Sequence, residues 1–592
     1  MAAAEEKTPV TPLVREDGLA ALREDALWDV VIVGGGATGA GIAVDAASRG
    51  LKTLLLEGQD FSAGTSSRST KLIHGGVRYM KNLRDWGLVH GALQERRRLI
   101  DNCPQLVHAE PFVLPCYRKW ERETYTVGLG IYGAMAGKAQ IGRTRTLKPA
   151  EAAARLPGVK TDGLTGGVEF FDAQFDDARL NVALMRTAAH HGAVCLNYMP
   201  VTGVERTGGL IQAVTAEDAE TGESFRIRCR MVFNCAGVWA DEVRRMVEPD
   251  AVKLLRFSRG THVVVDRSFL SGDAGMLIPK TRDGRVLFAI PWHTGVLLGT
   301  TDVEVREAAR DPQPTEEEIA FILETASGYL ARPVGRGDVL AAFAGLRPLL
   351  SAPAGQESTA KASREHAVIP EFGNMITIAG GKWTSYRRMA EDAMFEATRR
   401  HLVPPRLCVT KDLPILVDDR FNPEEIEAAA CAGEDADARV VEYALYAREC
   451  EGARTARDVL WRRLRVGALN EARAEALVPK IEAAFEGRVW EAPEVAPEAA
   501  EAVEAVEAVE AVEAVETVEA VEAVEIAEPE VKAETPVETP TEAPAEAAPE
   551  AEPEDKSEEK SEEKPEVPVS APEAEAEVVT AKAEAAEGGA AR

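Results

Sequence analysis

A glycine-rich turn near the start of the chain constrains its fold more than any other feature. Residues 28–57 read WDVVIVGGGATGAGIAVDAASRGLKTLLLE, in which Gly34, Gly36 and Gly39 form a G-x-G-x-x-G spacing. The first glycine permits a tight turn, the second lets the backbone approach a pyrophosphate, and the third lets the next helix pack closely on the strand. The segment predicts a strand at 30–33, a helix and a strand at 53–56 that together bind a dinucleotide.

Glu57 ends the second of these strands. An acidic side chain at this position can accept hydrogen bonds from both hydroxyls of an adenosine ribose, and it repels a 2′-phosphate. We therefore expect a ligand other than NADP. The turn alone does not separate FAD from NAD.

A hydroxyl-rich segment follows, and it favours the longer cofactor. Residues 62–80 read SAGTSSRSTKLIHGGVRYM. Its Ser and Thr side chains can bond a pyrophosphate, and the glycines after His74 let a flat ring approach the backbone. The apolar residues inside this segment argue against an ordinary solvated loop.

Three long blocks give the chain a family resemblance. They are VGGGATGAGIAVDAASRG at 33–50, GTSSRSTKLIHGGVRY at 64–79 and GGKWTSYRRMA at 380–390, with shorter matches in FFDAQFDDARLN, NCAGVWAD, GTHVVV, GTTD and AGLRPLL. With these blocks the chain resembles the FAD-dependent, quinone-linked glycerol-3-phosphate dehydrogenases, including the mitochondrial type. The resemblance runs from about residue 28 to 398 and continues weakly to about 485.

The resemblance implies an activity and its partners. The expected reaction is oxidation of sn-glycerol 3-phosphate to dihydroxyacetone phosphate, with hydride passing to flavin N5 and electrons passing to a membrane quinone. A glycerol-3-phosphate oxidase that uses oxygen and makes hydrogen peroxide stays open as an alternative. An amine or amino-acid oxidase of the same fold and a flavin-binding scaffold whose tail carries the function are more distant alternatives.

The expected fold is α/β with an α+β cap. A Rossmann-like FAD-binding domain of the glutathione-reductase/amino-acid-oxidase type is expected from residues 28–115, 171–262 and 340–400. An antiparallel β-sheet substrate cap is expected from 116–170 and 263–339. A small helical domain at 405–489, a flexible extension at 1–27 and a disordered Glu/Ala/Val/Pro tail at 490–592 complete the prediction. Residues 126–137 are apolar, and we weigh a buried cap helix against a segment that dips into lipid.

The cofactor-binding candidates come from the glycine turn, the hydroxyl-rich segment and two later strand ends. Such strand ends turn the chain close to the cofactor, and the last one aims a helix N-terminus at an electron-rich group. The candidates are Gly34, Gly35, Gly36, Thr38, Gly39, Glu57, Thr65, Ser66, Ser67, Ser69, His74, Gly75, Gly76, Ala236, Gly237, Gly381, Lys382, Trp383 and Thr384.

The reaction also needs a base for the hydroxyl proton and cations for the phosphate and the developing carbonyl. The candidate base is His262, with His74 as a rival, because a neutral imidazole titrates in the right range. By family resemblance, Arg347, Arg364 and Lys382 lie near the reacting face of the flavin, and Arg347 and Lys382 join His262 as catalytic candidates. Arg78 and Tyr79 are expected to line the substrate side.

Charge and cysteine content set the remaining expectations. The chain carries a net charge of −30, and the segment from 491 onward holds 32 acidic and 6 basic residues, so the rest is nearly neutral. This distribution argues against nucleic-acid binding. The eight cysteines match no metal spacing, so no metal site is expected. We expect a cytoplasmic protein, peripheral on the inner face of the cytoplasmic membrane, and leave a homodimer open.

Overall fold

The glycine turn lies in the strand–helix–strand unit that its sequence predicts. The computed structural model describes residues 10–77, 80, 85–282, 284–351, 365–433 and 436–487. Strand β1 (Leu27–Val33) leads through the turn into helix α2 (Ala37–Ser48), and β2 (Thr53–Leu56) lies parallel to β1. The expected strands at 30–33 and 53–56 are thereby confirmed.

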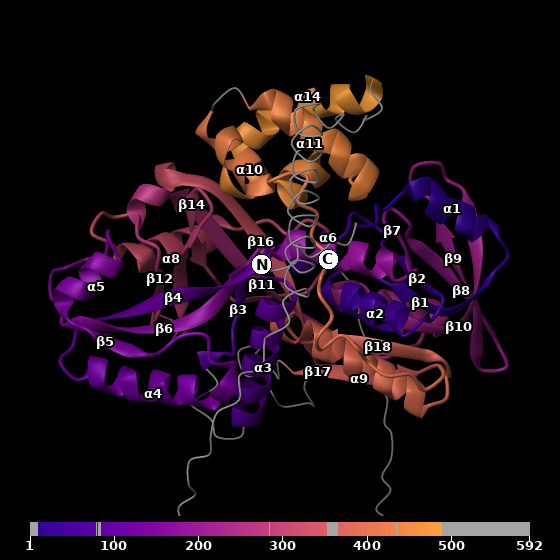
Figure 1. Ribbon diagram of the computed structural model, residues 1–592, viewed down its shortest axis with the longest axis horizontal. Helices are drawn as coiled ribbons and strands as arrows, with labels where there is room; N and C mark the ends of the chain where they lie inside the picture. The colour runs from indigo at the N-terminus through magenta and orange to yellow at the C-terminus, as the bar shows by residue number, and fades with distance from the viewer. Residues whose placement is uncertain are drawn as a thin grey trace, which may run out of the picture. The chain divides into compact units, whose positions relative to one another are not determined.

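A mainly parallel sheet is built around this unit (Figure 1). Its order is β17-β18-β10-β1-β2-β7, and β17 alone along this path pairs antiparallel. Strands β8 and β9 extend β10 as an antiparallel meander. The further strands are β7 (Val194–Leu196), β8 (Val201–Thr207), β9 (Leu210–Glu217), β10 (Ser224–Asn234), β17 (His366–Glu371) and β18 (Met375–Gly380).

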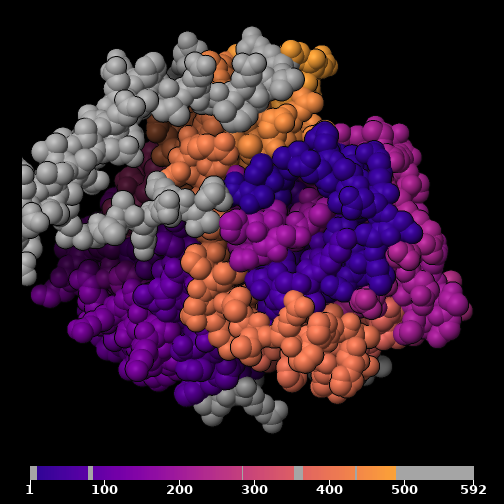
Figure 2. Space-filling model, turned by 45° about the vertical axis from the view of Figure 1, so that its right-hand side comes forward, coloured from indigo at the N-terminus to yellow at the C-terminus, as the bar shows by residue number. Residues whose placement is uncertain are grey.

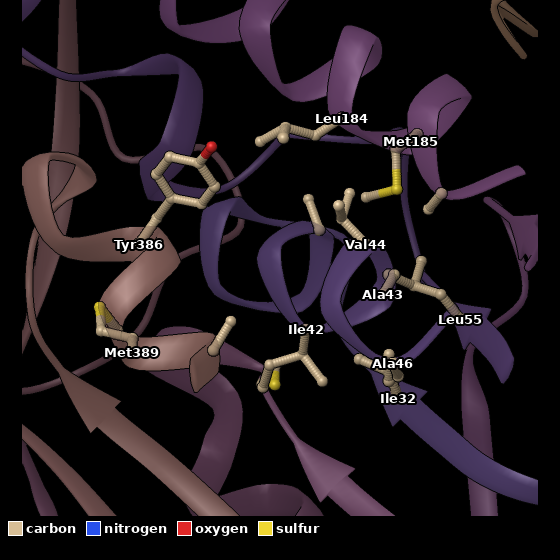
Figure 3. Packing of buried hydrophobic residues seen from close by; sticks show 14 of the residues in the cluster. Ile32, Ile42, Ala43, Val44, Ala46, Leu55, Leu184, Met185, Tyr386 and Met389 are labelled. Atoms are coloured by element: carbon tan, nitrogen blue, oxygen red, sulfur yellow. The ribbon is translucent and has the colours of Figure 1, made fainter. Parts of the chain in front are cut away.

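Helix α2 is buried between two other helices (Figure 3). Leu184 and Met185 of α6 (Asp177–His190) approach it from one side, and Tyr386 and Met389 of α9 (Tyr386–Arg399) approach it from the other. On the surface, the indigo N-terminal segment accordingly lies beside the orange segment that carries α9 (Figure 2). This packing holds the N-terminus of α2 in place at the end of β1.

A second, larger sheet carries the cap. Its order is β15-β11-β14-β13-β12-β4-β6-β3, with β16 paired to β11 and β5 paired to β6. Its strands are β3 (Leu72–Ile73), β4 (Val107–Cys116), β5 (Arg145–Leu147), β6 (Gly166–Phe175), β11 (Leu255–Asp266), β12 (Gly275–Ile278), β13 (Leu287–Trp292), β14 (Gly295–Gly299), β15 (Val303–Val305) and β16 (Val339–Leu350). This sheet therefore takes in strands that the sequence analysis divides between the cap and the FAD-binding domain.

Helices complete both parts of the fold. Around the second sheet lie α3 (Trp86–Asn102), α4 (Glu121–Met135), α5 (Pro149–Arg155) and α8 (Glu316–Ser327), and α7 (Ala240–Val247) follows β10. Residues 423–487 form a helical domain with its own apolar core. Its elements are α10 (Pro423–Ala432), α11 (Asp437–Cys450), α12 (Ala456–Asp458), η10 (Val459–Arg463), α13 (Val466–Leu469) and α14 (Glu471–Gly487).

The N-terminal segment differs from the expectation of a flexible extension over residues 1–27. Helix α1 (Arg15–Arg23) buries Leu19 and Leu22 against the first sheet. Its Arg15 guanidinium also donates a hydrogen bond to the Asn197 carbonyl at 2.6 Å. The predicted tail at 490–592 lies outside the described residues.

Candidate functional site

The glycine turn brings two strand ends into direct contact. Gly34 has a φ of +112°, and a Cβ on it would lie 2.4 Å from the Cys235 carbonyl oxygen at the end of β10. A Cβ on Gly39 would lie 1.9 Å from the Gly34 carbonyl oxygen, so only glycine lets α2 pack this closely. The candidates Gly34, Gly39 and Ala236, the residue after Cys235, therefore meet at one point.

Glu57 lies at this same point. Its carboxylate accepts hydrogen bonds from the Gly35 N–H at 2.6 Å and from the Gln59 N–H at 2.8 Å. Burial raises the pKa of Glu57, although these N–H groups oppose the shift. An acceptor-only group beside the turn suits the hydroxyls of a ribose.

Within the hydroxyl-rich stretch, residues 64–71, called segment 64–71 below, contact the start of α2 and the residues after β18. The Ser66 hydroxyl accepts a hydrogen bond from the Ala37 N–H at 2.9 Å, and the Ser66 carbonyl accepts one from Trp383 Nε1 at 2.8 Å. The Thr384 hydroxyl lies 3.2 Å from both the N–H and the carbonyl oxygen of His74. The structure thus joins three separate stretches of predicted cofactor residues.

A buried ion pair holds this segment, and the sequence analysis does not assign either partner to the site. Lys71 Nζ lies 2.7 Å from Asp177 Oδ2 and donates to the Ser67 carbonyl at 2.7 Å, with both side chains fully buried. Burial and the nearby Arg465 charge lower the pKa of Lys71 to about 7, against the attraction of Asp177. Ser69 also donates through its hydroxyl to Asp177 at 2.7 Å. The sequence signals for this pair are the position of Lys71 inside a matching block and the two consecutive aspartates, 176 and 177, at the start of α6.

The candidate base, His262, lies on β11 with only 2% of its surface exposed. Its Nε2 shares a hydrogen bond with the Thr70 hydroxyl at 3.0 Å, whereas its buried Nδ1 has no hydrogen-bond partner among the described residues. The ring stacks on Phe343, with 5.1 Å between centroids. Burial, assisted by the charges of Lys71 and Arg347, lowers the pKa of His262 well below its usual range. The imidazole is therefore neutral at physiological pH.

Arg347 approaches His262 across the paired strands β11 and β16. It is opposite Ser258 in the register, and its Nη2 donates to the Thr300 hydroxyl at 3.2 Å. A Cβ on Gly260 would lie 2.3 Å from Arg347 Nη2, so the guanidinium lies over this glycine, midway between Ser258 and His262. Asp302, in the GTTD match, lies 3.7 Å from Arg347 Nη1.

Some of the remaining candidate residues are described by the structure, and others are not. Lys382 follows β18 and precedes the short helix η9 (Trp383–Ser385), two residues from the Thr384 contact with His74. Gly75 donates its N–H to the Tyr132 hydroxyl at 2.8 Å. Arg78, Tyr79 and Arg364 lie outside the described residues. Their substrate-binding roles stay predictions.

The arrangement fits a long dinucleotide cofactor. A glycine cradle that a Cβ would fill lies beside a helix N-terminus, which favours a pyrophosphate. A carboxylate lies beside that cradle, and a hydroxyl-rich segment runs from it toward His262. The residues that would hold FAD are therefore those of the turn, Glu57, the segment 64–71 and the residues after β18.

This fold and site define the class of protein. The chain matches the family described as DAO, FAD dependent oxidoreductase, over residues 29–387, and it belongs to that family. Among its relatives, the mitochondrial glycerol-3-phosphate dehydrogenase of Bos taurus is 41% identical over 408 residues, which are 66% of this chain and 55% of that protein. The chain thus spans about half the length of that relative. The mitochondrial enzyme of that name from Arabidopsis thaliana is 41% identical over 427 residues, covering 70% of this chain and 67% of that protein.

Solved structures agree with the fold. A glycerol-3-phosphate dehydrogenase from Bacillus halodurans complexed with FAD has a TM-score of 0.60 and 27% identity, covering 80% of this chain and 97% of that one. An L-alpha-glycerophosphate oxidase from Mycoplasma pneumoniae, at 17% identity and a TM-score of 0.51, shares the fold. It covers 66% of this chain and 100% of that one.

The close packing at Gly39 yields a prediction about cofactor binding. We expect Gly39→Ala to weaken FAD binding at least about tenfold, because the new Cβ forces α2 away from the strand end that positions its N–H groups. The measurement is the Kd for FAD by fluorescence titration of the stripped protein. Gly91→Ala on α3 is the control, since nothing lies within 4 Å of the added Cβ. Equal affinities in the two variants would contradict the prediction.

Proposed function

We propose that the chain oxidises sn-glycerol 3-phosphate to dihydroxyacetone phosphate and passes the electrons to a quinone. The observation that carries the proposal is the juxtaposition of a neutral, buried His262 with the Arg347 guanidinium over Gly260. A base and an anion-binding cation so close together suit a small phosphorylated alcohol. The relatives named glycerol-3-phosphate dehydrogenase support the same substrate.

In the proposed reaction, His262 takes the proton from the substrate hydroxyl. When its Nε2–H donates to the Thr70 hydroxyl, Nδ1 keeps a lone pair, and Nδ1 has no hydrogen-bond partner in the described part of the chain. Stacking on Phe343 keeps the ring plane fixed and excludes water from that face. FAD, when bound, supplies the acceptor for the hydride.

Arg347 binds the phosphate in this proposal. A guanidinium can form two parallel hydrogen bonds to phosphate oxygens, which also fixes the orientation of the substrate. Two residues that follow strand β14, Thr300 and Asp302, contact the guanidinium and hold it in place. Lys382 adds positive charge where the carbonyl develops.

The decisive experiment is anaerobic mixing of the FAD-loaded protein with sn-glycerol 3-phosphate while the visible flavin absorbance is followed. The proposal expects bleaching, followed by reoxidation faster with a soluble quinone than with oxygen. A flavin that stays oxidised contradicts the substrate assignment. Rapid reoxidation by oxygen with a full yield of peroxide would favour the oxidase.

We expect Arg347→Ala to raise the KM for sn-glycerol 3-phosphate about tenfold to a hundredfold, because it removes charge-assisted hydrogen bonds to the phosphate. The measurement is steady-state kinetics with a quinone acceptor, at confirmed full FAD occupancy. Arg336→Ala is the control, since that arginine lies on the cap with 58% of its side chain exposed. An unchanged KM in Arg347→Ala would remove this residue from the site.

The depressed pKa of His262 leads to a prediction about pH. The base loses function only when it binds a proton, so a lowered pKa moves that loss to more acidic pH. We expect the rate of flavin reduction by substrate to stay level from pH 8 down to pH 6.5 and to fall only below it. Stopped-flow reduction over this range is the measurement. A half-maximal rate at or above pH 6.5 would contradict the assignment.

A membrane-contacting surface is proposed on α4, because the quinone is a membrane component. Trp120, Val127 and Ile131 form an exposed apolar stripe, with 62%, 64% and 40% of their surfaces accessible. Their spacing places them on one helical face, while Leu129 and Tyr132 are buried on the other. In the sequence, exposed basic residues precede and follow the stripe, namely Arg118, Lys119, Lys138 and Arg143. This pattern is typical of a helix lying in the interface of an anionic bilayer, which suits a peripheral protein on the inner membrane face.

No helix in the described part of the chain is both long enough and apolar enough to cross a bilayer.

We expect the double variant Val127→Glu/Ile131→Glu to bind phosphatidylglycerol vesicles at least about tenfold more weakly, because two carboxylates replace the apolar contact and repel the lipid. Vesicle cosedimentation measures the affinity. Leu407→Glu is the control, because Leu407 is 88% exposed and lies around a different pocket, together with Arg49 and Phe395. Unchanged binding in the double variant would place the lipid contact elsewhere.

A further inference from the structure

Arg465 has an unusual place in the C-terminal helical domain of residues 423–487. It lies between η10 and α13 with a φ of +68°, a left-handed conformation that disfavours residues with a side chain. Its side chain is also almost fully buried, with 2% exposed. Surrounding contacts must therefore stabilise both the backbone conformation and the buried charge.

These contacts lie on the hydroxyl-rich segment 64–71 and its ion pair. Arg465 Nη2 donates to the Ser67 carbonyl and to Asp177 Oδ1, each at 3.2 Å. Its Nη1 donates to the Trp461 carbonyl at 2.9 Å, and the guanidinium lies 5.3 Å from the Trp292 ring centroid. The helical domain thus contacts segment 64–71 through the Arg465 side chain.

The Ser67 carbonyl is the point where two cations meet. Lys71 Nζ and Arg465 Nη2 both donate to it, and both contact Asp177. On one side of Ser67, the Ser66 hydroxyl accepts the Ala37 N–H at the start of α2. On the other side, Thr70 bonds His262. A shift of Ser67 therefore disturbs both the cofactor cradle and the candidate base.

We infer that Arg465 is a positioning residue through which the helical domain holds the cofactor-binding segment 64–71. Arg465 acts through Ser67 and Asp177, and it fixes the backbone from which Ser66 and Thr70 project. The inference rests on the FAD site of the proposed function and is independent of the substrate.

Other buried arginines attach the helical domain without touching this segment. Arg186 on α6 donates to the Tyr446 hydroxyl at 2.7 Å and to Asp418 at 2.9 Å, and its side chain is 2% exposed. Its loss would loosen the attachment of the same helical domain, because Tyr446 lies on α11. Arg186 therefore provides a control for general destabilisation, matched in residue type and burial.

The experiment compares Arg465→Met, Arg465→Lys and Arg186→Met in the full chain. The readouts are the Kd for FAD by fluorescence titration and the thermal midpoint of the FAD-loaded protein. We expect Arg465→Met to weaken FAD binding at least about tenfold, while Arg186→Met lowers the thermal midpoint and changes the Kd less than about twofold. Arg465→Lys keeps the charge but cannot reach its three acceptors together, so we expect an intermediate Kd.

Equal FAD affinity in Arg465→Met and Arg186→Met would overturn the inference, because the arginine would then act only on stability. If Arg465→Met does not fold, Arg465→Lys decides: a Kd at the wild-type value overturns the inference, and a weakened Kd supports it. A chain that binds FAD but is not reduced by sn-glycerol 3-phosphate would refute the proposed substrate and leave this test intact.

Discussion

The ion pair between Lys71 and Asp177 is the contact on which the arrangement of the site depends. A fully buried ammonium group is costly unless it is paired and hydrogen-bonded, so the chain around Lys71 must bring it acceptors. Asp177 and the Ser67 carbonyl meet this need, and in doing so they fix the backbone of segment 64–71. Ser66 and Thr70 then point to α2 and to His262 as a consequence. Removal of Asp177 would leave Lys71 without the carboxylate that compensates its burial, whereas removal of Lys71 would leave Asp177 paired with Arg465.

Local signals in the sequence predict the cofactor cradle well. The glycine spacing reflects a steric requirement, because a side chain at Gly34 or Gly39 would collide with neighbouring backbone. Strands β1 and β2 and helix α2 form where this spacing predicts them. The N-terminal cap of α6 is also set by a local contact, made by the residue directly before the helix. The structure assigns the cap to Asp176, which accepts the N–H groups of Ala178 and Arg179. Family resemblance supplied His262 and Arg347 as candidates, and the structure places them near one another.

The contacts that complete the site join residues far apart in the chain, and no local pattern reports them. Asp177 is 106 positions from Lys71, and Arg465 is 288 positions from Asp177. Within the helical domain predicted at 405–489, the structure separates η10 from α13 at Arg465, where the distant contacts of its side chain stabilise a left-handed backbone conformation. The sequence expectation of a flexible start likewise differs from α1, whose stability comes from packing on a sheet formed by distant strands.

Gly260 carries a consequence for which molecules the site accepts. The guanidinium of Arg347 lies where a side chain on Gly260 would project, and the contacted atoms are the flexible end of Arg347. The register of strands β11 and β16 therefore fixes the separation of the His262 imidazole and the Arg347 guanidinium. Because residue 260 has no side chain, the guanidinium can lie over it, closer to His262. A larger residue at position 260 would increase the distance between the His262 imidazole and the Arg347 guanidinium without changing the pairing of the two strands. For the substrate proposed above, position 260 would therefore set how long an alcohol chain fits between His262 and Arg347, without a change at the glycine turn.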